Sequence, residues 1–111
     1  MKVENMTNSK GNTVANQFII HEWHPQFKYK TFQSYKSEIV VCEDWWKEDE
    51  EEGILHIYSH SKLKLRGKMW DYSNTTRKYF KIFINEETPF TYENKAQWLK
   101  EIENNNNIEV L

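Results

Sequence analysis

The four histidines are the residues whose chemistry most suggests a metal site or a catalytic centre. They stand at positions 21, 24, 56 and 60. On a strand, His21 and His24 would point to opposite faces, and His56 and His60 would share a face about 13 Å apart. A zinc ion needs several ligands within about 2 Å of one point, and the two histidines of a helical H-E-x-x-H motif are four residues apart. We therefore expect no metal site and no cofactor.

Nucleophilic catalysis has equally little support. Cys42 is the only cysteine, and the acids that follow it, Glu43 and Asp44, would raise the pKa of its thiol. No G-x-S-x-G turn occurs, and three glycines in the whole chain leave no glycine-rich phosphate loop. We expect Cys42 to be a small core residue, and the protein not to be an enzyme. A lone cysteine also fits a reducing compartment such as the cytoplasm.

Charge is the feature that points to binding. The net charge is −2, but residues 43–52 hold seven acids against Lys47, and residues 62–81 hold seven bases against Asp71. Such blocks can neutralise one another in the fold, face two different partners, or simply be solvated. Each block therefore defines a candidate surface.

The acidic block combines clustered carboxylates with two adjacent tryptophans. Tryptophan is frequent at binding hot spots, and clustered acids can imitate a nucleic-acid backbone. The simpler alternative is a loop whose tryptophans pack back onto the core. The candidate partner-binding residues are Asp44, Trp45, Trp46, Glu48, Asp49, Glu50, Glu51 and Glu52.

The basic block could instead hold single-stranded nucleic acid, with phosphates on the cations and bases stacked on Tyr58, Trp70 or Tyr72. The alternative is that Trp70 and Tyr72 seal the sheet against a helix while the lysines only aid solubility. The candidate nucleic-acid-binding residues are Lys62, Lys64, Arg66, Lys68, Arg77 and Lys78.

The elements that must position these residues begin with three strands. Residues 15–23 carry apolar side chains on both faces, residues 30–43 alternate at period two, and residues 54–68 alternate apolar with basic positions. The third strand has room for a break at residues 59–61. The acidic block between the second and third strands reads as a loop closed by Gly53.

Two helices follow. Ser73 is a suitable N-cap for a helix over residues 74–85 that places Phe80 and Phe83 on one face. A second helix carries Trp98 and Ile102 on its apolar stripe, and the asparagines at 104–107 end it. We expect an α+β domain, with an antiparallel sheet of three to four strands and both helices packed on one face.

The boundaries follow from composition. Residues 1–14 are polar without periodicity and indicate a flexible N-terminal arm. Residues 15–103 form one domain, and residues 104–111 form a C-terminal tail. Seventeen aromatic residues predict an aromatic-rich core. The longest aliphatic run, residues 39–42, is far too short to cross a membrane.

Three blocks resemble one family: "NQFII" at 16–20, "TFQSYKSEI" at 31–39 and "KMWDYSNTTRKYFKIFI" at 68–84. They are similar to an uncharacterised family of short proteins from tailed phages and prophages. The resemblance implies a phage or mobile-element protein in the host cytoplasm, and it implies no chemistry. This chain departs from the family pattern by extra length between Ile39 and Leu63, which includes the acidic block.

These observations together favour a protein that binds and inhibits a host nuclease or another defence protein, in the manner of an anti-CRISPR protein. The alternative is an accessory protein of phage DNA or RNA metabolism that holds single strands on the basic block. Gel shifts with single-stranded nucleic acid and co-purification with host nucleases separate the two hypotheses.

Overall fold

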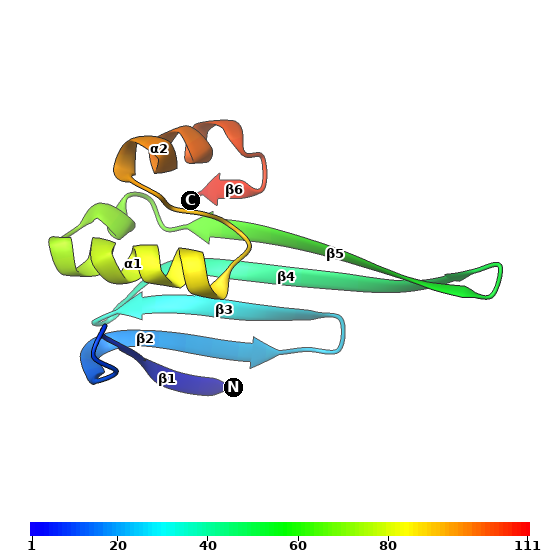
Figure 1. The fold of residues 1–111 in the computed structure, drawn as a ribbon, viewed down its shortest axis with the longest axis horizontal. Helices are drawn as coiled ribbons and strands as arrows, with labels where there is room; N and C mark the ends of the chain where they lie inside the picture. The colour runs from blue at the N-terminus through cyan, green and yellow to red at the C-terminus, as the bar shows by residue number, and fades with distance from the viewer.

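The computed structural model describes the backbone of residues 1–111 and every side chain except that of Tyr58. A six-stranded sheet runs through the molecule in the order β1-β2-β3-β4-β5-β6 (Figure 1). Neighbouring strands are antiparallel except β5 and β6, which are parallel. The strands are β1 (Lys2–Thr7), β2 (Thr13–Trp23), β3 (Phe27–Ser34), β4 (Ser37–Glu51), β5 (Ile54–Leu65) and β6 (Ile108–Val110).

The α+β class agrees with the sequence, but the expected antiparallel sheet of three to four strands is wrong, because the sheet is mixed and larger. Residues 1–14 were expected to form a flexible N-terminal segment but contain β1. Residues 104–111 were expected to form a C-terminal tail but contain β6. Met6 and Ile108 from these two segments are buried. The expected strand over residues 30–43 is split by a turn at Tyr35, whose backbone is left-handed with φ of 56°.

The helices are α1 (Asn74–Glu87) and α2 (Lys95–Asn104), preceded by a short 3-10 helix, η1 (Met69–Asp71). The Ser73 N-cap is confirmed, because its hydroxyl accepts a 3.1 Å hydrogen bond from the amide of Thr76. Asn94 caps α2 in the same way by accepting from the amide of Gln97 at 2.8 Å. Figure 1 shows α1 lying across one face of the sheet and α2 near β6.

The core between the helices and the sheet is rich in aromatic rings, as predicted. Phe80 and Phe83 have no exposed surface, and Phe80 meets Trp98 edge-on with ring centroids 5.6 Å apart. Cys42 is also fully buried, so its prediction as a core residue is confirmed. Burial, with a contribution from Asp44, raises the pKa of its thiol to about 12.

A two-stranded ribbon projects from this body. The neighbouring strand β3 pairs with β4 only as far as Trp45, and β6 pairs with β5 only at Leu63–Leu65. Residues 46–59 therefore extend without a third strand, and we call them the arm (Figure 1). The arm makes the molecule long, with principal extents of 52 × 32 × 26 Å.

Candidate functional site: the acidic arm

The acidic block forms the distal part of β4, so the loop expected there is wrong. Each acid of the block except Glu52 lies opposite a residue of β5, with Glu48 across from Ile57 and Glu51 across from Ile54. Aspartate and glutamate disfavour strands, but the facing β-branched residues favour them. Glu52 and Gly53 both have positive φ, at 54° and 78°, which is the geometry of the tight turn that matches the twist of a hairpin.

Five consecutive carboxylates line this end of the arm. Glu48, Asp49, Glu50 and Glu51 lie on β4, Glu52 lies in the turn, and all five are exposed. Among the described side chains, none of the five has an ion pair. An antiparallel strand rises about 3.4 Å per residue and successive side chains point to opposite faces, so each face of this end of β4 carries one negative charge per about 6.8 Å.

The two tryptophans stand at the base of the arm. Trp45 is 40% exposed, packs on Phe27 with ring centroids 4.6 Å apart, and donates its indole N–H to Glu43 at 3.4 Å. Trp46 is half-buried beside it. Both line a cleft of about 700 Å³ that Pro89 also lines. The tryptophans are thus held by the body of the protein but remain accessible at the rim of this cleft.

Asp44 differs from the other predicted partner-binding residues. Its side chain is half-buried, and Oδ1 accepts a 2.5 Å hydrogen bond from the hydroxyl of Ser61 on the facing strand. The same oxygen lies 3.8 Å from the thiol of Cys42. Asp44 therefore contributes to the junction between the arm and the core, and its carboxylate is already engaged.

The structure does not bring the predicted nucleic-acid-binding residues into one surface. Lys62 and Lys64 alternate along β5 with the buried Leu63 and Leu65, so they point away from the helices. In contrast, Arg77 and Lys78 lie on α1, and Arg66 and Lys68 lie between the end of β5 and η1.

Most of these cations already have an anionic partner inside the protein. Four ion pairs involve them: Lys62 with Glu109 (3.3 Å), Lys64 with Glu43 (2.8 Å), Arg66 with Glu38 (3.7 Å) and Arg77 with Asp71 (2.8 Å). The hydrogen bond that Lys64 donates to the carboxylate of Glu43 raises the pKa of Lys64. The Lys64 pair also shows that the two charged blocks partly neutralise one another.

The aromatic residues proposed for base stacking behave differently from one another. Trp70 is 3% exposed and stacks on Phe80 with ring centroids 5.7 Å apart, so it belongs to the core. Tyr72 is 78% exposed. The side chain of Tyr58 lies outside the described part of the structure. Residues 69–84 therefore form mainly a capped helix packed on the sheet, with Tyr72 as their exposed ring.

The histidines are placed in ordinary contacts. His21 lies 2.9 Å from a carboxylate oxygen of Glu4, and this hydrogen bond lowers the pKa of Glu4. His24 stacks on Phe27 with ring centroids 4.4 Å apart. Within the part of the chain that the structure describes, no group of three or more histidine, cysteine or acidic residues could hold a metal ion.

A second hollow, besides the cleft lined by Trp45 and Trp46, was not predicted from the sequence. A pocket of about 940 Å³ at the other end of the sheet is lined from all three blocks of the family resemblance, including Phe18, Tyr35 and Tyr72. The amide of Tyr35 donates to the carbonyl of Asn16 at 2.6 Å, and both residues have left-handed backbones. The pocket forms where three segments that are distant in the sequence pack together. The periodicity of strands and helices does not predict such packing.

Comparison with known proteins adds the family but no activity. The model of one protein family, described as a family of unknown function, matches residues 1–101. No curated protein and no solved structure matches the chain. No helix in the described residues is long and apolar enough to cross a membrane.

Proposed function

We propose that this chain, which belongs to the DUF8033 family of unknown function, is a non-catalytic phage or mobile-element protein that inhibits a defence effector in the host cytoplasm. The inhibitor inserts its acidic arm into the nucleic-acid-binding groove of the effector, a nuclease of the kind that anti-CRISPR proteins block. The unpaired carboxylates of Glu48–Glu52 provide the attraction.

The charge spacing of the arm carries this proposal. One strand of B-DNA presents one negative charge per about 3.4 Å of helix axis, which equals the charge per length of consecutive acids on an antiparallel strand when both of its faces are counted. Four such acids lie in succession on β4, and from Glu48 to Glu51 they rise about 10 Å along the strand. A groove lined with lysine and arginine to bind phosphates therefore meets a similar linear charge density along the arm.

The shape and anchoring of the arm support the same proposal. The arm is a two-stranded ribbon without a helix on either face, so it is thin enough to enter a groove that the body cannot enter. Trp45 and Trp46 stand where the arm joins the body, and tryptophan is enriched among the residues that carry most of the energy of a protein interface.

Direct nucleic-acid binding by the basic block has less support. Four of its six candidate cations have internal carboxylate partners, and a phosphate would have to displace these. The six residues are also divided between the sheet and α1. Holding single strands therefore stands as the competing outcome of the test.

The test compares two matched triple variants in nuclease assays. One neutralises the arm by Glu48→Gln, Glu50→Gln and Glu51→Gln. The control neutralises Glu38, Glu93 and Glu103, which are exposed and lie outside both the arm and the cleft lined by Trp45 and Trp46. Each protein is added to a panel of purified host RNA-guided and restriction nucleases, and DNA cleavage is measured at several salt concentrations.

We expect the wild type and the control triple to inhibit a nuclease of the panel, and the arm triple to lose inhibition. Inhibition should weaken as salt rises and as excess duplex DNA competes for the groove, because both reduce the electrostatic attraction. Equal inhibition by the arm triple would contradict the proposal. So would a wild type that inhibits nothing but shifts single-stranded DNA or RNA in a gel.

A further inference from the structure

The outer edge of β5 is open along the arm. The amide of Leu63 donates to Asn107 at 2.8 Å, and the carbonyl of Leu65 accepts from Leu111 at 2.9 Å. Backbone groups of alternate residues point to the same edge of a strand, and β5 pairs with β4 without a bulge. The amides and carbonyls of Leu55, Ile57, Ser59 and Ser61 therefore point to this edge, where no strand in the described chain pairs with them.

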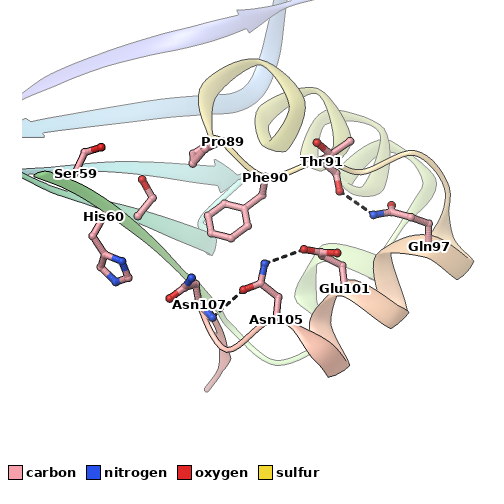
Figure 2. Close-up of a pocket in the computed structure, with 10 residues that line it drawn as sticks. Ser59, His60, Pro89, Phe90, Thr91, Gln97, Glu101, Asn105 and Asn107 are labelled. Carbon is pink, nitrogen blue, oxygen red and sulfur yellow. Dashed lines mark hydrogen bonds between the residues drawn. The ribbon is translucent and has the colours of Figure 1, made fainter.

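The space beside this edge is a hollow. Figure 2 shows Ser59 and His60 on one side of a pocket of about 560 Å³, with Phe90, Asn105 and Asn107 on the other sides. An added strand therefore has room beside residues 59–61 of β5, next to the segment where β6 pairs with β5.

The side chains along this edge are those of a strand that can pair with another strand. Natural edge strands are usually guarded by lysine, proline or a bulge, but residues 54–61 contain no charged residue and no proline. Ile54, Leu55 and Ile57 are 60%, 59% and 65% exposed. Because an isolated two-stranded hairpin is at best marginally stable in water, the arm gains most from additional strands.

We propose that a second copy of this chain pairs with β5 along this edge, in antiparallel orientation. A two-fold dimer needs an edge that is free over the same residues in both copies, and residues 54–61 meet that need by themselves. The two hairpins then form one four-stranded ribbon, with β5 strands at the centre and the acidic β4 strands on the outside.

The ends of the open edge fix the register. With Ile57 opposite the partner's Ile57, Leu55 faces the partner's Ser59 and His60 faces the partner's Ile54. The partner's hairpin turn then lies beside the hollow of Figure 2 and ends before Leu63, where Asn107 already occupies the edge.

The acidic strands do not prevent this pairing. Three strand spacings of about 4.8 Å separate the two β4 strands by about 14 Å. The Debye length at physiological salt is about 8 Å, so most of their repulsion is screened. Added salt should therefore strengthen the dimer, whereas it weakens attraction between the arm and a basic groove. Pairing covers the arm that a groove would receive, so the inhibitor acts as the monomer, and the opposite salt dependences let each proposal fail without the other.

The first experiment measures the association of the full chain by sedimentation equilibrium. We expect the dimer fraction of the wild type to rise with protein concentration and with salt up to about 1 M, where the Debye length is about 3 Å. Ser59→Pro and Ile57→Lys should both shift the protein to monomer. The proline removes only an outward-facing amide, so the β4–β5 ladder keeps its hydrogen bonds.

Leu99→Lys is the control, because Leu99 is 48% exposed on α2 and lies outside the arm. It should dimerise like the wild type. A wild type that stays monomeric at every concentration and salt overturns the proposal. Dimers that persist in both edge variants, with circular dichroism showing that these are folded, also overturn it.

The second experiment tests the register by cross-linking. The native thiol of Cys42 is buried with a pKa raised to about 12, so an introduced thiol is the reactive one. In a hydrogen-bonded antiparallel pair the Cα atoms lie about 5.5 Å apart, within disulfide range. Ile57→Cys should therefore give a covalent dimer under oxidised glutathione, which is reduced as the two thiols join.

Leu55→Cys is the matched control, since Leu55 has similar exposure in the same strand. In the proposed register its two copies lie about 14 Å apart, which is beyond the reach of a disulfide. Failure of Ile57→Cys to cross-link, or equal cross-linking by Leu55→Cys, overturns this arrangement.

Discussion

We expect the fold to become more stable when the buried polar side chain of Gln17 is replaced by an apolar one. It is 1% exposed on β2, and its side-chain oxygen Oε1 has no hydrogen-bond partner among the described atoms. A buried acceptor without a partner costs about 1–3 kcal/mol. Methionine has a similar length and volume, and such swaps cost less than about 1.5 kcal/mol. Gln17→Met should therefore stabilise the fold by about 1 kcal/mol, the cost of the unpaired oxygen less some repacking.

The assay is urea unfolding followed by circular dichroism, with thermal melting as a second measurement. A gain of about 1 kcal/mol corresponds to a rise of about 4 °C in Tm for a chain of this size. Gln33→Met is the matched control, because Gln33 is half-buried and its amide donates to the carbonyl of Tyr35 at 2.8 Å. The control should lose up to about 1 kcal/mol. A destabilised Gln17→Met variant would refute the reasoning and show that Oε1 is hydrogen-bonded in solution.

Three further predictions concern the helices and their ion pairs. Ser73→Ala removes the cap that holds the amide of Thr76 and should cost about 1 kcal/mol in urea unfolding, with no change in nuclease inhibition. Phe83→Ala empties a fully buried position and should cost about 3–5 kcal/mol, so a near-neutral result would contradict the packing of α1. Asp71 accepts from Lys95 at 2.7 Å and from Arg77 at 2.8 Å, and these contacts lower its pKa. Its stabilisation is present above the unfolded pKa and is lost as pH falls through the folded pKa, so the wild type and Asp71→Asn should converge in stability in acid. A stability difference that does not change with pH would exclude that role.

The helices were predictable from the sequence because their signals are local. The cap at Ser73 and the apolar line through Phe80 and Phe83 lie within one short stretch, and the structure confirms each of them. Here the free energy depends on residues three or four positions apart, so the sequence alone contains the necessary information.

The sheet was less predictable because its strands depend on partners that are distant in the sequence. β1 is an edge strand with one buried side chain, Met6, and so shows no alternation. The acidic run becomes a strand through β5 rather than through its own propensity. The turn at Tyr35 contains neither glycine nor asparagine, so it gave no local signal either.

The sequence indicated which residues are candidates for binding, but not how they are arranged in space. The acids of residues 48–52 are exposed, as a binding surface requires, whereas Asp44 is engaged with Ser61. The basic block looked continuous along the chain, but strand alternation and ion pairs such as Lys64 with Glu43 divide it. The pairs of Lys62, Lys64 and Arg66 each join residues more than twenty positions apart in the chain, which sequence spacing does not reveal.

The separation of the arm from the core has an evolutionary consequence. Among the described side chains of residues 46–59, which exclude that of Tyr58, none belongs to the buried hydrophobic core. Under the proposed function, substitutions in the arm change its contacts with a target and leave the packing of the body unchanged, since surface changes away from special contacts shift stability by about 0.5 kcal/mol or less. Selection can then change the charge pattern and tip of the arm through many neutral steps. A protein in conflict with a changing host target can follow that target at this segment without losing its fold.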